Sequence, residues 1–220
     1  MPWRFRWLAR HKRLVNNRPF GYNPLMRIVA GSKRGMKLYE PRGMVSRPIL
    51  DRVKESLFSI LYGYDLPEGA RVADVFSGVG SLGLEALSRG ARCVTFVERD
   101  PDIGQTLRRN IDKAGFADRS RVVRTNAFVS GAVPGPDSPV YDLVFVDPPY
   151  PATQDVGQQS PLAGLIEVLG RQVTDRAIVT VRTHKRIALP AAYGPFKVID
   201  RRVWGTMAIA LLRKAGGATP

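Results

Sequence analysis

Short apolar segments alternate with helical ones through most of the chain, and this alternation restricts the possible folds more than any other feature. Strands are predicted at 71–76, 92–98, 121–125, 141–146 and 176–181. Helices are predicted at 81–89, 101–114 and 161–173, with a short helix or turn after Asn126. Strands that are apolar throughout are typical of a parallel sheet with helices on both faces. We therefore expect an α/β fold with a Rossmann-like, doubly wound, mostly parallel sheet.

Both ends of the chain add to this sheet. Residues 196–214 predict two strands around a turn at Gly205, which indicates an antiparallel hairpin at the C-terminal edge. Residues 26–45 predict a small β-hairpin, and apolar residues at helical spacing predict a helix from Pro48 to a stop at Gly63. We expect four parts: a basic, flexible extension (1–25), a hairpin-and-helix appendage (26–66), a main domain (67–214) and a tail (215–220).

The charge of the chain indicates a polyanionic partner. Its 220 residues include 34 Lys and Arg but only 19 Asp and Glu, which gives a formal net charge of +15. No acidic residue precedes Glu40, so the N-terminal end is the most basic part. Nucleic acid is the first candidate for a partner of such a protein.

Other classes of protein are disfavoured by what the chain lacks. A single cysteine, Cys93, excludes a disulfide within a monomer and a cysteine-based metal site. Two histidines, His11 and His184, disfavour a histidine-rich metal site. No apolar run approaches the roughly 20 residues that span a bilayer. We expect a soluble, cytoplasmic, monomeric protein without a bound metal.

The segment DVFSGVGSLG, at 74–83, follows the first strand of the main domain and opens a helix. Gly78, Gly80 and Gly83 fit the pattern G-x-G-x-x-G, and Glu98 ends the next predicted strand. Such a loop lets a nucleoside approach the backbone without a Cβ in the way. The acid can then accept hydrogen bonds from ribose hydroxyls. The loop predicts a nucleoside-containing cofactor, with Gly83 in helix–sheet packing.

Two features favour S-adenosylmethionine over a nicotinamide dinucleotide. Asp74 precedes the glycines, and its carboxylate would repel a pyrophosphate but attract the ammonium of a methionine moiety. The fourth strand ends in DPPY, and the first and fourth strands of a doubly wound sheet flank the point where ligands bind. The residues that we expect to bind the cofactor here are Asp74, Phe76, Ser77, Gly78, Gly80 and Glu98.

The segment DPPY, at 147–150, matches the [DN]-P-P-[YFW] signature of methyltransferases that act on exocyclic or side-chain amino nitrogens. Such a nitrogen on a base is a poor nucleophile, because its lone pair is delocalised into the ring. The Asp147 carboxylate and the Pro148 carbonyl can each accept one N–H hydrogen bond, which turns the lone pair toward the methyl group. Pro148 and Pro149 fix φ and aim the carbonyl in advance, and Tyr150 can stack on the base. These four residues are the predicted catalytic set.

Longer segments extend the likeness over about 26–214, among them RPILDRVKESLFSIL, DVFSGVGSLGLEALSRGA, FVERD, NAF and FVDPPY. With them the chain resembles the RsmD family, bacterial methyltransferases that place a methyl group on guanine N2 of small-subunit ribosomal RNA. The resemblance implies that Asp74, Gly78 and Gly80 contact the methionine part of the cofactor. It further implies that Glu98 contacts the ribose and that Asn126 and Ala127 lie at the adenine. Three basic residues would lie near the cofactor entrance and the RNA: Arg47, Arg52 and Lys54.

Besides the 25 extra N-terminal residues, the chain departs from the family pattern in two places. Ile49 and Leu50 stand where the family usually has small hydroxyl residues. On the fifth strand, Arg182 stands where an acid is common. These differences bear on contacts with the RNA and on one face of the site more than on the reaction type.

The implied substrate is ribosomal RNA, within the small subunit or an assembly intermediate. The four residues of DPPY, called the clamp below, would hold the guanine amino group. A guanine held in this way must leave the base stack, so we expect a flipped or unstacked guanine. Basic residues on the two predicted hairpins are candidates for phosphate contacts: Arg27, Lys33, Arg34, Arg201 and Arg202.

Three other functions stay open from the sequence. An adenine-N6 methyltransferase acting on DNA or RNA would use the same amino-group clamp. A nicotinamide-dependent oxidoreductase would use the glycine loop, but Asp74 and DPPY argue against it. A non-catalytic RNA-binding module would account for the charge, but it would not need a complete clamp.

Overall fold

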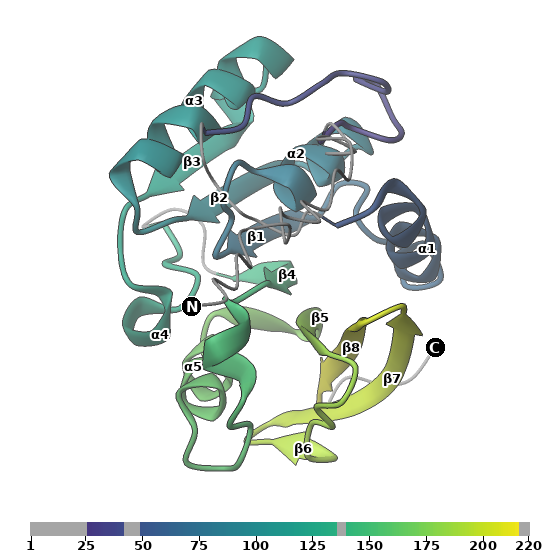
Figure 1. The fold of residues 1–220 in the computed structure, drawn as a ribbon, viewed down its shortest axis with the longest axis vertical. Coiled ribbons are helices and arrows are strands. Elements are labelled where there is room, and N and C mark those ends of the chain that lie inside the picture. The colour runs from purple at the N-terminus through teal and green to yellow at the C-terminus, as the bar shows by residue number, and fades with distance from the viewer. Residues whose placement is uncertain (1–25, 42–48, 136–139, 216–220) are drawn as a thin grey trace, which may run out of the picture.

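An eight-stranded sheet forms the centre of the protein (Figure 1). The computed structural model describes residues 26–41, 49–135 and 140–215. The strands lie in the order β3-β2-β1-β4-β5-β8-β7-β6. They are β1 (Arg71–Val75), β2 (Cys93–Val97), β3 (Ser120–Val123), β4 (Tyr141–Val146), β5 (Val173–His184), β6 (Ala192–Tyr193), β7 (Phe196–Trp204) and β8 (Met207–Lys214).

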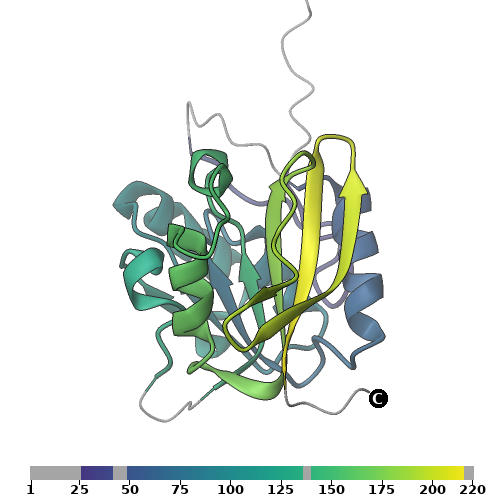
Figure 2. The same cartoon turned by 90° about the horizontal axis from the view of Figure 1, so that it is seen from below.

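The first five strands are parallel, and the last three join the sheet antiparallel to their neighbours. Figure 2 shows β7 and β8 side by side at that edge. The predicted α/β fold, with a mostly parallel sheet and an antiparallel C-terminal edge, is confirmed. The strand order reverses between β1 and β4, so the switch point lies where the sequence predicts it.

Helices cover both faces of the sheet (Figure 1). The buried apolar residues form two clusters, one on each face of the sheet. One cluster includes residues of α1, α2 and α3, and the other includes residues of α4 and α5. The helices are α1 (Asp51–Tyr62), α2 (Ser81–Ser88), α3 (Pro101–Ala114), α4 (Ala127–Ser130) and α5 (Pro161–Leu169), with short 3-10 turns at η1 (Ala117–Arg119) and η2 (Tyr150–Thr153). Within the described ranges, none of the helices has the length and apolar content needed to cross a bilayer.

Helix boundaries lie where the sequence predicts them when polar capping residues mark the helix end. The Asp100 carboxylate accepts hydrogen bonds from the backbone N–H groups of Asp102 and Ile103, and Gly115 ends α3 with φ at 69°. By contrast, α5 ends at Leu169, before the predicted limit, and β5 begins at Val173 rather than at 176. The residues between them are apolar enough for either structure, so periodicity does not locate this boundary. The two-residue strand β6 was not predicted.

The N-terminal segment forms a looser structure than the predicted hairpin. A single β-bridge joins Arg27 to Lys37, and a turn connects them. This turn lies against the end of α2, where Ser88 accepts a hydrogen bond from Ser32 N and the hydroxyl of Ser88 accepts one from Lys33 N. The predictions for residues 1–25, Arg47 and Pro48 lie outside the described residues.

Glu85, on α2, connects this segment to the core. Its side chain is fully buried, and its two oxygens accept hydrogen bonds from the backbone N–H groups of Val29 (2.7 Å) and Ala30 (2.9 Å). The same carboxylate pairs with Arg89 at 2.8 Å and with Lys54 at 3.6 Å. One buried carboxylate therefore joins α1, α2 and the N-terminal segment.

Lys54 has a different role from the one that the sequence indicates. Its side chain is 1% exposed, and its ammonium donates a hydrogen bond to the Arg27 carbonyl at 2.7 Å. Burial lowers the pKa of Lys54, and the nearby Glu85 carboxylate opposes this shift. The prediction that Lys54 lies at an RNA-binding surface is wrong, because α1 turns this residue inward with its apolar stripe.

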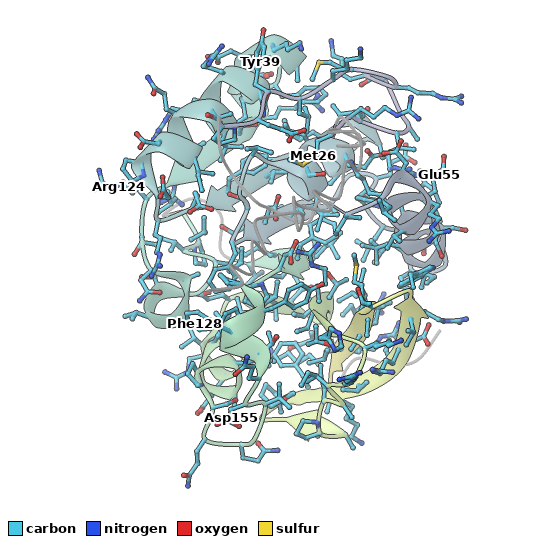
Figure 3. All side chains as sticks on the ribbon, viewed as in Figure 1. Met26, Tyr39, Glu55, Arg124, Phe128 and Asp155 are labelled. Carbon is cyan, nitrogen blue, oxygen red and sulfur yellow. The ribbon has the colours of Figure 1, made fainter. Side chains whose placement is uncertain are left out.

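We predict that Glu85→Gln destabilises the protein by about 3–5 kcal/mol, because it leaves Lys54 and Arg89 buried without their counter-charge. Chemical denaturation followed by circular dichroism would measure the loss. Glu55→Gln is the matched control, because Glu55 lies exposed on α1 (Figure 3). A midpoint for Glu85→Gln equal to that of the control would contradict the role assigned to Glu85.

Candidate active site

A cavity of about 940 Å³ opens at the edge of the sheet where β1, β2 and β4 end. This volume is at the upper end of the range for small-molecule sites, about 300–1,000 Å³. The structure brings most of the predicted cofactor-binding and catalytic residues to its walls: Asp74, Phe76, Ser77, Gly78, Glu98, Asn126, Ala127, Asp147, Pro148, Pro149 and Tyr150. Met26 and Ile49 add walls from the N-terminal part of the chain.

The loop after β1 presents its backbone to the cavity at Gly78. This residue has φ at 55°, and a Cβ placed on it would meet no atom within 4 Å. Gly80 does not line the cavity. Its φ is 88°, and a Cβ there would lie 2.6 Å from Leu107 Cδ1, so the close approach of α3 requires this glycine. Gly80 therefore has a packing role, and its contact with the cofactor stays a prediction.

Asp74, at the tip of β1, is a buried carboxylate with one backbone donor. Its side-chain oxygen Oδ2 accepts a hydrogen bond from Gly83 N at 2.8 Å. Burial raises the pKa of Asp74 to about 8, and the carboxylates of Asp147 and Glu98 act in the same direction. The Gly83 hydrogen bond opposes this shift without cancelling it. A cationic ligand group would relieve the cost of ionising Asp74.

Glu98, at the tip of β2, holds the glycine loop in place. One oxygen accepts a hydrogen bond from Gly78 N at 3.0 Å, and the other accepts one from Asp100 N at 2.9 Å. The carboxylate thus faces the cavity beside the open backbone of Gly78. Its contact with a ribose stays a prediction.

An aromatic pair forms the wall next to the predicted adenine position. Asn126 caps α4 by accepting a hydrogen bond from Phe128 N, which fixes the turn that also exposes Ala127 to the cavity. The rings of Phe76 and Phe128 are 4.8 Å apart between centroids. Phe128, labelled in Figure 3, follows directly on Asn126 and Ala127 in the sequence, but no role was predicted for it.

The DPPY segment is tied to β1 and to β5. Asp147 N donates a hydrogen bond to the Val75 carbonyl at 3.2 Å, and η2 begins at Tyr150. On the other side, Oδ1 of Asp147 lies 2.5 Å from Nε of Arg182. This oxygen is buried, although 19% of the whole side chain is exposed. Burial raises the pKa of Asp147, and Arg182 opposes that rise.

The predicted RNA-binding residues do not form one group. Lys33 and Arg34 lie in the turn against the C-terminal ends of α2 and α3, whereas the cavity lies at the N-terminal ends of these helices. Arg27 pairs with Asp51, and Arg52 is exposed on α1. Arg201 and Arg202, by contrast, lie toward the cavity end of β7. RNA contacts for the exposed residues stay predictions.

The family described as Conserved hypothetical protein 95 matches residues 26–213. The chain belongs to this RsmD-like family of S-adenosylmethionine-dependent methyltransferases. Ribosomal RNA small subunit methyltransferase D of Escherichia coli strain K12 is 35% identical over 191 residues, which cover 86% of this chain and 90% of that protein.

Solved structures of other proteins share the fold. The structure of yhhF from Escherichia coli has a TM-score of 0.72 and 33% identity, with 88% of this chain and 99% of that chain covered. An RNA methyltransferase from Salinibacter ruber, solved with S-adenosyl-L-homocysteine, has a TM-score of 0.57. At 16% identity over 79% of this chain and 97% of that chain, it shows likeness of fold alone.

The cavity fits S-adenosylmethionine on its own chemistry. The open backbone at Gly78 allows a close approach of the ligand, and the buried Asp74 is a partner for an ammonium group. The rings of Phe76 and Phe128 form an apolar wall. The residues on these walls to which sequence reasoning gave no role include Met26, Arg99, Ile103, Phe128 and Arg182. The spacing of the motifs gives no sign of the first three, because they reach the cavity from neighbouring loops and from α3.

We predict that S-adenosyl-L-homocysteine binds with release of a proton from Asp74. With a pKa of about 8, this carboxyl is mostly protonated at neutral pH, but the ligand ammonium favours its ionised form. Affinity should therefore rise with pH, by up to about tenfold per unit between about pH 6 and pH 7.5. Calorimetry in buffers of different ionisation enthalpy would count the proton.

Asp74→Asn should bind more weakly, with no dependence on pH across that range. Asp118→Asn, a change at an exposed carboxylate outside the cavity, should behave like the unmodified protein. A flat affinity profile for the unmodified protein would contradict the predicted release of a proton from Asp74.

Proposed function

We propose that this protein methylates the exocyclic N2 of a guanine in small-subunit ribosomal RNA. The observation that carries the proposal is the position of Asp147–Tyr150 on the same cavity as Asp74 and Gly78. Family membership and the 35% identity to a small-subunit ribosomal RNA methyltransferase support the substrate. The net charge of +15 suits a polyanion.

The chemistry asked of the protein is mainly positioning. S-adenosylmethionine, when bound, supplies an activated methyl group. The Asp147 carboxylate and the Pro148 carbonyl accept the two N–H hydrogen bonds of the base amino group, which leaves its lone pair directed away from the base plane. Tyr150 stacks on the base and Pro149 limits movement of the loop. Correct orientation of two reactants can supply about 7–11 kcal/mol.

The rival functions differ in how they use these residues. An adenine-N6 methyltransferase would use the same clamp, so only the identity of the product separates it from the leading proposal. An oxidoreductase is less well supported, because the pyrophosphate of a dinucleotide has no cationic group with which to stabilise an ionised Asp74. A non-catalytic RNA-binding module would have no use for the clamp.

A basic turn beside the clamp suits the RNA backbone. β5 ends at His184, whose ring lies 6.3 Å from that of Tyr150 between centroids, and the exposed Lys185 and Arg186 follow it. Arg201 holds this turn by donating hydrogen bonds to the carbonyls of Lys185 (2.7 Å) and Ile187 (3.1 Å). Arg201, predicted to bind phosphate, thus supports a turn whose own basic side chains are exposed.

The deciding experiment identifies the methylated nucleoside. The protein is incubated with labelled S-adenosylmethionine and, separately, naked ribosomal RNA, small subunits or plasmid DNA. Label in N2-methylguanosine is the expected result. Label in N6-methyladenine would replace the proposal with its rival, and absence of label from all three substrates would overturn both.

In the same assay, Asp147→Ala should lower turnover by at least about a hundredfold, because one acceptor of the clamp is lost. Affinity for S-adenosyl-L-homocysteine, measured by calorimetry, should stay nearly unchanged. Asp118→Ala is the control for loss of an exposed carboxylate elsewhere. Loss of cofactor binding in Asp147→Ala would contradict this division of roles.

We predict that Lys185→Glu with Arg186→Glu raises KM for the RNA by about tenfold or more. The slope of log affinity against log salt concentration should become shallower by an amount that corresponds to about two phosphate contacts. The same charge change at Lys33 and Arg34, at the far end of α2, should have a smaller effect. Filter binding at several salt concentrations would compare the two. A larger loss from the Lys33 and Arg34 pair would place the RNA backbone along the N-terminal segment instead.

A further inference from the structure

Arg182 is the residue of the cavity that the family pattern does not lead one to expect. Because Val146 of β4 pairs with Val181 of β5, the next residues, Asp147 and Arg182, lie side by side at the sheet edge. Their side chains are 19% and 14% exposed, and Nε of Arg182 lies 2.5 Å from Oδ1 of Asp147. The guanidinium carbon also lies 5.9 Å from the centroid of the Tyr150 ring.

We propose that Arg182 is a positioning residue that keeps the Asp147 carboxylate ionised and turns one chosen oxygen, Oδ2, toward the base. This inference rests on the proposed function of the DPPY segment. It assigns a role to Arg182 that goes beyond the clamp itself.

The surroundings of Asp147 explain why such a partner is needed. The groups that face or neighbour it are the carboxylates of Asp74 from β1 and Glu98 from β2, Arg182 and His184 from β5, and Tyr150 from its own loop. Burial favours a neutral carboxyl, and so does the Asp74 carboxylate when it is ionised. A neutral carboxyl carries a proton, so it presents a donor where the base amino group needs an acceptor. Arg182 is the cation in direct contact that opposes this.

The geometry of an arginine also restricts which oxygen is used. Its guanidinium is planar and always charged, and it contacts one oxygen of the carboxylate through Nε, whereas a lysine ammonium is a point charge on a flexible stem. Because Oδ1 is buried and lies in the ion pair with Nε, Oδ2 is the oxygen left for the amino group. The guanidinium near the ring of Tyr150 links the two parts of the clamp, the acceptor and the stacking surface.

The ion pair also limits what Asp147 contributes to catalysis. Because Arg182 balances most of its charge, Asp147 has little net negative charge with which to stabilise a cationic amine. Its contribution is then to accept a hydrogen bond and orient the nitrogen.

The test compares Arg182→Met, Arg182→Lys and a control, Arg176→Met, which removes an exposed arginine from the other end of β5. The quantity measured is kcat/KM for RNA methylation as a function of pH. Loss of Arg182 should raise the pKa of Asp147, so the acid limb should move to higher pH by at least about one unit. Activity lost near neutral pH should return at alkaline pH, partly so in Arg182→Lys, and Arg176→Met should match the unmodified protein.

A second readout does not depend on activity. The titration of the Asp147 carboxyl, followed by carbon-13 NMR in the ligand-free protein and assigned with Asp147→Asn, should move to higher pH in Arg182→Met. A profile of Arg182→Met that superimposes on that of the unmodified protein would overturn the proposal, as would an equal loss of activity at every pH. If no RNA is methylated by the unmodified protein, the proposed function fails, and the carboxyl titration still decides the role of Arg182. If Arg182→Met does not fold, Arg182→Lys gives the same two readouts.

Discussion

The contact between β1 and β4 is the constraint on which the site depends. These strands are adjacent only because the chain crosses over after β3 and returns to the middle of the sheet, and their pairing runs to Val75 and Val146. The hydrogen bond from Asp147 N to the Val75 carbonyl continues that pairing one step past the strands. It brings the glycine loop and the DPPY segment to one cavity, although about seventy residues separate them in the sequence.

Buried charge serves two purposes in this protein. Glu85 has four partners, two backbone donors and two cations, so its charge is compensated and its effect is to hold elements together. Asp74 has, among the described residues, one backbone donor and carboxylate neighbours, so its ionisation is costly. The difference is in the number of partners rather than in burial, since both side chains are almost inaccessible. A carboxylate left short of partners is ready for a cationic ligand.

Local signals in the sequence located many of the structural features correctly. Asp100 and Gly115 delimit α3 because capping chemistry depends on neighbouring residues alone. The boundary between α5 and β5, however, depends on pairing of Val173 with Tyr141, which is distant in sequence. The burial of Lys54 and the packing role of Gly80 likewise depend on Glu85 and Leu107, which reach them across the fold. The partner of Arg182 follows from the register of β4 and β5, which the sequence does not reveal.

The separation of charges at the site addresses the opposite needs of its two proposed ligands. The cofactor carries a sulfonium and an ammonium group, and the cavity meets it with the carboxyl groups of Asp74 and Glu98. The RNA carries phosphates, and the exposed basic turn at Lys185 and Arg186 lies outside the carboxylates, next to Tyr150. Arg182 stands between these two regions and pairs with the acid nearest to the base. Acidic side chains at the mouth of the cavity would repel the RNA phosphates. A cation between the cavity and the basic turn therefore lets one small surface bind both ligands.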